Sequence, residues 1–153
     1  MYHEKDTALY LPLKLIPMLT KYEISLIKKS WISFRDIDAA VFADVFYTKL
    51  FLENPSLRKM FPNEMNKQYQ KLVDMLNIIV ARLEKMDELT KDIQQMARRH
   101  VDYGVKPEHY TMVGKALLWT LKSGLGDKWT EELKQAWIKC YSILSGTMLA
   151  ATK

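Results

Sequence analysis

The sequence predicts an all-α protein with one domain. Glycine and proline occur only five times each in 153 residues, and 48% of the residues are apolar. Such a composition favours helices and supports one sizeable core. Apolar residues recur at the spacing of one helical face, in segments bounded by residues that cap or break helices. The one apolar run that could form a strand, residues 41–46, lies inside a longer glycine-free segment, so helix is favoured there.

The first two helices are predicted between residues 20 and 52. Thr20 and Glu23 have the spacing of a capping box, in which side chain and backbone bond reciprocally at a helix start. The apolar face that follows consists of Ile24, Ile27, Trp31 and Phe34. Asp36 or Asp38 can cap a second helix that runs to about Leu52.

The next three helices are predicted between residues 54 and 104. Asn54 before Pro55 is the pattern of a cap followed by proline at the first helical position, so we expect a short helix that ends near Phe61. The longer helix after it has the apolar stripe Leu72, Met75, Leu76, Ile79 and Leu83. Asp87 is expected to begin the following helix, and Gly104 to end it. The buried side of that helix would carry Leu89, Ile93, Met96 and His100.

The last two helices bring the predicted number to about seven. Pro107 is expected to begin the sixth helix, and Gly124 and Gly126 to end it. Its apolar residues in register are Tyr110, Val113 and Leu117. Thr130 is expected to cap the seventh helix. The apolar face of the seventh helix consists of Leu133, Trp137, Tyr141, Leu144 and Met148.

Charge and cysteine content exclude some partners and compartments. The net charge of +5 comes from 23 basic and 18 acidic residues. These charges are spread along the chain, which indicates solvated helix faces and not a nucleic-acid surface. The single cysteine, Cys140, forms no intrachain disulfide. Its place on an apolar helix face is typical of a structural cysteine, and we expect a reducing, cytoplasmic location.

The beginning of the chain is expected to be an extension, residues 1–19, that precedes a domain formed by residues 20–153. Residues 8–19 are largely apolar, but Lys14 and two prolines interrupt them and acidic residues come before them. A signal peptide needs a basic start and a longer apolar run. No apolar run in the sequence is long enough to span a bilayer, so no transmembrane segment is expected.

Several kinds of catalytic site are excluded by their motifs. The pair Gly124 and Gly126 is followed by Trp129 where a dinucleotide fingerprint needs its third glycine. No phosphate-binding loop is present, and no cysteine or histidine spacing matches a zinc site. A Ser-His-Asp or Cys-His arrangement stays open, because its members need not be close in sequence.

One of the three histidines has an unusual position. His3 lies in the extension and His109 near the start of the sixth helix, but His100 continues the apolar face of the fifth. It is either a core histidine bonded to a backbone carbonyl or an axial ligand of a haem iron. An iron ligand requires an imidazole on the apolar wall of a helical pocket.

Three segments of the sequence, one of which contains His100, decide between these interpretations. They are residues 46–55 (FYTKLFLENP), 68–72 (QYQKL) and 98–110 (RRHVDYGVKPEHY). With Phe61 after the first and Val113, Gly114, Leu117 and Leu118 after the last, they resemble bacterial single-domain globins and the globin part of flavohaemoglobins, in the same order. The resemblance covers roughly residues 20–148 and implies the globin fold around a haem pocket.

The resemblance implies haem b, iron protoporphyrin IX, as the cofactor. His100 matches the iron ligand, and Tyr47 and Gln68 match the polar residues on the opposite, distal side where a gas binds. The other residues implied to line the haem site are Phe61, Lys71, Leu72, Arg99, Val105, Tyr110 and Val113.

Some of these lining residues have more specific implied roles. Phe61 matches a phenylalanine that stacks on the haem plane, and Tyr110 matches a tyrosine that forms a hydrogen bond near the iron ligand. Lys71 and Arg99 match partners of the haem propionates. Ordinary core packing is expected of Phe61 and Leu72 alongside any role at the haem, and simple solvent exposure is the alternative for Lys71 and Arg99.

The sequence departs from the flavohaemoglobin pattern in two places. The span between Phe61 and Gln68 is shorter, so a shift of two would make Gln70 the distal residue. Thr152 occupies the ungapped position of a glutamate that polarises the iron ligand in that family. No flavin or nicotinamide segment follows it, so a separate reductase is the expected electron donor.

The distal residues limit the function. No histidine lies between residues 4 and 99, so a distal histidine is impossible and Tyr47 and Gln68 are the donors. A charge-assisted hydrogen bond to bound dioxygen contributes roughly 1.5–3 kcal/mol. Slow dioxygen release suits dioxygenation of nitric oxide to nitrate. Oxygen storage, transport or sensing, and carriage of haem or sulfide, are the alternatives; carbon monoxide is a further expected ligand.

Overall fold

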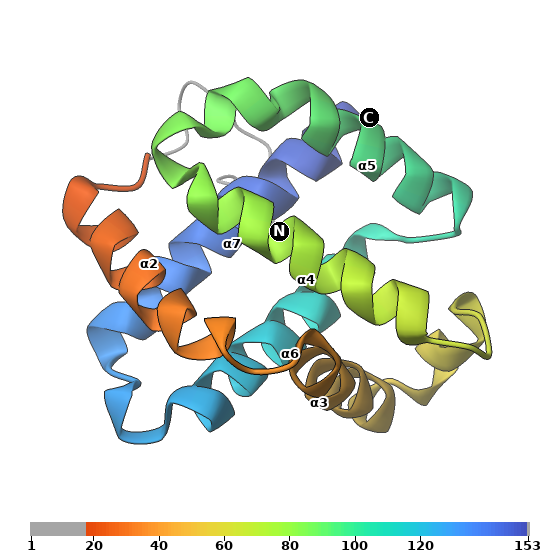
Figure 1. The fold of residues 1–153 in the computed structure, drawn as a ribbon. Coiled ribbons are helices and arrows are strands. Elements are labelled where there is room, and N and C mark those ends of the chain that lie inside the picture. Colours follow the sequence, from red (N-terminus) through yellow and green to blue (C-terminus); the bar gives the residue numbers. More distant parts are fainter. Residues whose placement is uncertain (1–17, 153) are drawn as a thin grey trace, which may run out of the picture.

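Helices make up almost all of residues 18–152, the part of the chain that this computed structural model describes. The α-helices are α2 (Lys21–Arg35), α3 (Ala39–Glu53), α4 (Asn66–Ala81), α5 (Thr90–Asp102), α6 (Pro107–Leu125) and α7 (Glu131–Ala151). Three 3-10 helices join them, η2 (Pro55–Met60), η3 (Leu83–Leu89) and η4 (Gly126–Lys128) (Figure 1). Within these residues there is no strand, and residues 41–46 lie inside α3, so the predicted all-α class is confirmed. The predicted extension falls almost wholly outside the described residues.

Side-chain caps define where several helices begin, as predicted. At the start of α2 the Thr20 backbone donates to Glu23 Oε1 (2.8 Å), and the Glu23 backbone donates to Thr20 Oγ1 (3.1 Å). The Asp38 carboxylate accepts from the Ala40 backbone at 2.9 Å, so Asp38 and not Asp36 caps α3. Thr130 accepts from the backbone of Leu133 in the same way and begins α7.

Three helix ends differ from the prediction. The Asn54 amide donates backwards to the Leu50 carbonyl (3.1 Å), so it closes α3 and does not cap the short helix after it, which is a 3-10 helix. The helix predicted from Asp87 begins at Thr90, because residues 83–89 form η3 with a non-helical backbone at Lys85. Gly124 lies inside α6, which ends where Gly126 takes a positive φ of 54°.

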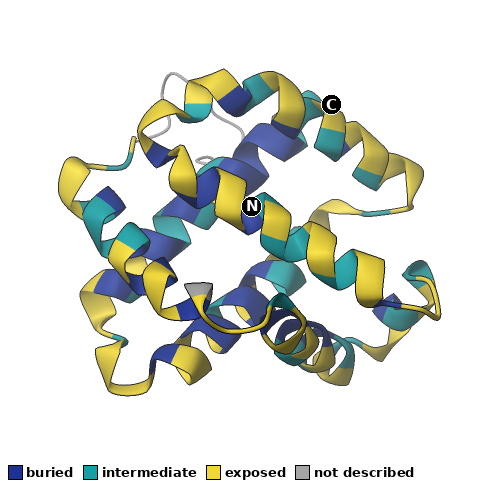
Figure 2. Cartoon of the chain, viewed as in Figure 1, coloured by how far each residue is buried: buried dark blue, intermediate teal, exposed yellow. Residues whose placement is uncertain are grey.

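The apolar faces of the helices meet in one core. The largest side chains that are fully buried are Trp137, Ile27, Leu50 and Leu121, which come from α7, α2, α3 and α6. The Trp137 ring nitrogen donates to Ser30 Oγ at 3.0 Å, so the one polar atom of that ring has a partner in the core. Figure 2 shows buried positions on the inner faces of the helices and exposed positions on their outer faces.

The arrangement of the helices separates α4 from α5. Helix α4 packs on α3 and α2, whereas α5 packs on α7 and η3, and the two are not among the helices that pack extensively on each other. In Figure 1, α4 runs diagonally across the front, with α5 above it to the right and α3 below it. Gln68 and His100 are therefore carried by two helices that do not pack extensively on each other.

Candidate functional site

His100 lies in the last turn of α5, where the buried face of the helix reaches the surface. Ile93 and Ala97 on this face are buried, while Met96 and His100 are partly buried. His100 Nδ1 is 2.7 Å from the carbonyl oxygen of Met96. A carbonyl can only accept, so Nδ1 carries the hydrogen and Nε2 carries a lone pair. Burial lowers the pKa of His100 below its ordinary value, which favours this neutral form.

The chain turns sharply after His100. Gly104 has a φ of +86°, a left-handed conformation that favours glycine. The backbone of Val105 then donates to the carbonyl of His100 at 2.9 Å. This turn leads into α6, and it brings the partly buried Val105 next to the end of α5.

Tyr47 is the buried polar group of α3. Only 5% of its surface is exposed, and burial raises its pKa to about 12. The Tyr47 hydroxyl oxygen accepts a hydrogen bond of 3.0 Å from Gln68 Nε2 on α4. Its ring lies 4.9–5.8 Å, between centroids, from four other aromatic rings, those of Phe46, Phe51, Phe61 and Tyr69.

The two glutamines that sequence analysis left as alternatives have different surroundings. Gln68 is partly buried and contacts Tyr47. Gln70 is exposed, and its amide donates to Asp74 of the same helix at 2.8 Å. Of the two, Gln68 is therefore the residue that the structure brings to Tyr47.

The remaining predicted residues divide by exposure. Those that are partly buried are Phe61, Leu72, Val105, Tyr110 and Val113. Lys71 and Arg99 are exposed, and neither forms an ion pair among the described residues. The backbone carbonyl of Tyr110 accepts from the Tyr141 hydroxyl at 2.6 Å. A hydrogen bond between Tyr110 and His100 is not found among the described residues.

Other residues with reactive side chains have structural roles. His109 Nδ1 accepts from the Lys106 backbone at 2.9 Å, so it caps the start of α6. Burial raises the pKa of Cys140 to about 12, which keeps the thiol protonated and supports its predicted structural role. Thr152, the residue after α7, donates from Oγ1 to the Leu149 carbonyl in the last turn of that helix at 3.2 Å. His3 lies outside the described residues.

Sequence analysis missed one pair beside Tyr47. The Tyr69 hydroxyl donates to Asp44 Oδ1 at 2.8 Å, and the Tyr69 ring is stacked on that of Tyr47. Asp44 lies about one turn before Tyr47 on α3, and Tyr69 follows Gln68 on α4. No motif marks this pair, because it depends on how α3 and α4 pack against each other.

The residues of this site suit a metal whose other ligands are supplied by a cofactor. The described residues contain no cluster of three or more His, Cys, Asp or Glu side chains that could hold a metal ion. His100 offers a single imidazole lone pair beside partly buried apolar side chains. A porphyrin supplies four further nitrogen ligands and a flat apolar surface, so this set of residues suits haem.

The comparisons with known proteins agree with this chemistry. A family model described as Globin matches residues 44–148. Flavohemoproteins of Oceanobacillus iheyensis and Bacillus subtilis are 35% and 32% identical to this chain, each over 71% of its length. A flavohemoprotein of Vibrio cholerae is 30% identical over 84% of this chain. The matches cover only 27%, 28% and 33% of those three proteins.

Two solved structures have the same architecture. A bacterial globin from Campylobacter jejuni has a TM-score of 0.74 and 25% identity, and the match covers 86% of this chain and 95% of that one. An engineered carbene transferase, built on a proposed nitric oxide dioxygenase from Rhodothermus marinus, has a TM-score of 0.76 and 26% identity. That match covers 88% of this chain and 92% of the other.

Proposed function

The chain belongs to the globin family, and we propose that it binds haem b through His100 and binds dioxygen and other diatomic gases there. We further propose that it uses dioxygen to convert nitric oxide to nitrate, with electrons from a partner reductase. A reductase is proposed because the curated relatives are flavohemoproteins. When bound, the haem supplies the iron at which the gases bind and react.

The hydrogen bond between His100 Nδ1 and the Met96 carbonyl is the observation that carries the proposal. It fixes the tautomer and the orientation of the ring, as carbonyl partners do for metal-binding histidines in general. The Nε2 lone pair is then available for iron. Burial lowers the pKa of His100, so the neutral imidazole that a metal requires is favoured.

The haem would be held by residues from five parts of the chain. Phe61 after η2 and Leu72 on α4 would pack on it from one side. Val105, Tyr110 and Val113 would pack on it near His100. Lys71 and Arg99 are exposed cations, which suits contacts with propionates at the edge of the site.

Tyr47 and Gln68 would act on the bound gas. A hydroxyl carries one hydrogen, and the Tyr47 oxygen already accepts from Gln68, so the Tyr47 hydrogen is free to donate to dioxygen. A donor of this kind strengthens dioxygen binding by roughly 1.5–3 kcal/mol. Slow release favours a protein that consumes dioxygen over one that delivers it.

The experiment that tests the proposal mixes the dioxygen-loaded protein with nitric oxide. Single-turnover mixing should yield one nitrate per haem. Steady consumption of nitric oxide should follow when NADH and a flavin reductase are added. The matched control is His109→Ala, which changes a histidine that caps α6. This variant should give the same nitrate yield and the same turnover as the wild type. A protein that gives one nitrate but does not turn over with any reductant is not a dioxygenase.

Oxygen storage or sensing without turnover is the second candidate function. It is favoured by Thr152, whose side chain bonds to the last turn of α7 and offers no carboxylate at that end of the helix. Failure of reductase-coupled turnover, together with reversible dioxygen binding, would establish this alternative.

Within the described residues, no helix is long and apolar enough to cross a membrane. We propose a cytoplasmic location because the single cysteine, Cys140, is a free thiol.

A further inference from the structure

We propose that Tyr69 and Asp44 are positioning residues that hold the Tyr47 hydroxyl in place for the distal hydrogen bond. The inference rests on the proposed function, because it assigns these two residues a role in the same site. It concerns side chains that lie outside the predicted set of haem contacts and that bond to each other at 2.8 Å.

Two hydrogen bonds tie the same two helices together. Gln68 and Tyr69 are neighbours on α4, and Tyr47 and Asp44 are three residues apart on α3. Gln68 donates to Tyr47 (3.0 Å) and Tyr69 donates to Asp44 (2.8 Å). Two bonds at different points along a helix resist both sliding and rotation of α4 on α3. A single bond would restrict rotation of α4 less than the two bonds together.

The stacked rings of Tyr47 and Tyr69 reinforce these two hydrogen bonds. Their centroids are 5.7 Å apart and their planes are 16° from parallel, a spacing within the range of aromatic contacts. A stacked neighbour limits the tilt of the Tyr47 ring. The direction in which the Tyr47 hydroxyl points therefore depends on where Tyr69 is held.

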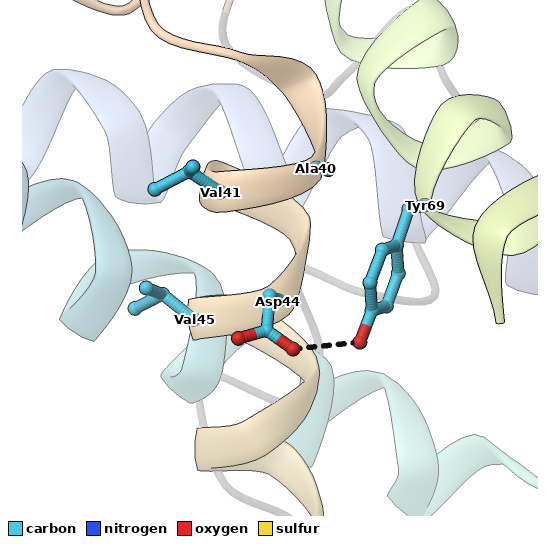
Figure 3. A pocket seen from close by; sticks show the side chains of 5 residues that line it. All are labelled: Ala40, Val41, Asp44, Val45 and Tyr69. Carbon is cyan, nitrogen blue, oxygen red and sulfur yellow. Dashed lines mark hydrogen bonds between the residues drawn. The ribbon is translucent and has the colours of Figure 1, made fainter.

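The Tyr69–Asp44 bond lies at the surface of the molecule. Figure 3 shows the two side chains pointing toward each other and joined by this bond. Together with Ala40, Val41 and Val45 they line an open pocket of about 320 Å³. Asp44 is exposed and Tyr69 is partly buried. The carboxylate raises the pKa of Tyr69 above its ordinary value, so this hydroxyl remains a protonated donor. An exposed bond contributes little to stability, but it can still set a position.

The expected effect is on dioxygen release. A hydrogen bond weakens steeply as its angle and distance depart from ideal values. Tyr69→Phe keeps the stacked ring and removes the bond to Asp44. We expect dioxygen to dissociate about three- to tenfold faster from this variant, less than from Tyr47→Phe, which removes the donor itself.

A double-mutant cycle in the haem-loaded protein tests the inference. Tyr69→Phe is made alone and together with Tyr47→Phe, and the dissociation rate of dioxygen is measured. If Tyr69 acts through Tyr47, then Tyr69→Phe changes nothing in the Tyr47→Phe background. A general structural effect would instead change the rate equally in both backgrounds, and that result would overturn the inference.

Two further variants sharpen the test. Asp44→Asn keeps an oxygen that can accept from Tyr69, so its dissociation rate should stay close to that of the wild type, whereas the rate of Asp44→Ala should rise to that of Tyr69→Phe. Glu84→Gln is the matched control, because Glu84 is another exposed carboxylate that accepts from a different element, at 2.9 Å from Lys28. It should leave the rate unchanged.

Infrared spectra provide a readout independent of activity. The stretching frequency of bound carbon monoxide reports the donor beside it, and Tyr47→Phe defines the frequency without that donor. Tyr69→Phe should shift part of the band toward this frequency, and no shift would overturn the inference. If Tyr47→Phe itself leaves both the band and dioxygen release unchanged, the distal role of Tyr47 in the proposed function fails, which is a separate outcome.

Discussion

The side-chain amide of Gln68 donates a hydrogen bond of 3.0 Å to the hydroxyl oxygen of Tyr47 and so joins α4 to α3. This direction of the bond matters, because a hydroxyl has a single hydrogen. With its oxygen acting as acceptor, Tyr47 keeps that hydrogen for another partner, and no described residue accepts it. Gln68 therefore orients Tyr47 and does not compete with it.

Replacing Tyr47 by phenylalanine removes the proposed donor while keeping the ring. Loss of about 1.5–3 kcal/mol corresponds to roughly ten- to hundredfold faster dioxygen release. Carbon monoxide accumulates less charge, so its release should change much less, and autoxidation should rise. Stopped-flow measurement of both ligands checks this. Equal shifts of the two release rates would show that Tyr47 is not the donor.

Gln68 and Gln70 should behave differently when shortened. Gln68→Ala removes the bond that orients Tyr47, so dioxygen release should accelerate by about three- to tenfold. Gln70→Ala removes only a bond to Asp74 within α4, so the release rate should stay at the wild-type value. The reverse result would mean that α4 is rotated in solution and that Gln70 is the distal residue.

The two described histidines give the clearest contrast for haem binding. His100→Ala should lose the Soret band or release haem rapidly to a scavenging apoglobin, because the proposed iron ligand is gone. His109→Ala should retain haem and lose only about 1 kcal/mol of stability, the usual effect of removing a helix cap. Normal haem retention in His100→Ala would refute the assignment.

The sequence predicted elements better than it predicted contacts between them. The Thr20–Glu23 capping box, the start at Pro107 and the Thr130 cap are local patterns, and the structure confirms each. The start near Asp87 was wrong, because η3 replaces a continuous helix there with a distorted one. Capping residues and apolar periodicity do not indicate such a kink, because tertiary packing determines it.

The site shows the same limit. His100 could be proposed as a site residue from the sequence because it continues an apolar helix face and its neighbours resemble a known pattern. The choice between Gln68 and Gln70 could not be made from the sequence, because it depends on the register of α4. A shift of two residues turns the helix face by about half a turn. The Tyr69–Asp44 bond was not predictable at all, because its partners are 25 positions apart on different helices.

Alkaline pH should weaken the fold through Tyr47. Burial raises its pKa to about 12 from 10.0, so folding favours the protonated phenol. This stabilisation is fully present below a pH of about 10 and is lost as the pH rises toward about 12. The loss in unfolding free energy is at most about 3 kcal/mol. Urea unfolding at several pH values should show a smaller alkaline decline for Tyr47→Phe than for the wild type.

The last prediction concerns Gly114, at which α6 approaches α7 closely. A Cβ atom added there would lie 2.7 Å from Cε2 of the Tyr141 ring, a distance that requires something to move. The Tyr141 ring cannot simply turn aside, because its hydroxyl donates to the Tyr110 carbonyl at 2.6 Å. Gly114→Ala should therefore lower the unfolding free energy by about 1–3 kcal/mol, as overpacking of a core does.

The same substitution should also affect haem affinity, because Tyr110 and Val113 on α6 are proposed haem contacts. Displacing α6 from α7 moves both of them, so haem should dissociate faster from Gly114→Ala than from the wild type. Lys115→Ala, at the exposed neighbouring position, is the control and should change neither quantity. Shortening the opposing ring in Gly114→Ala/Tyr141→Leu should recover part of the stability, since the added methyl group then has space. A double variant less stable than the sum of the two single changes would show that the contact between Gly114 and Tyr141 is not the cause.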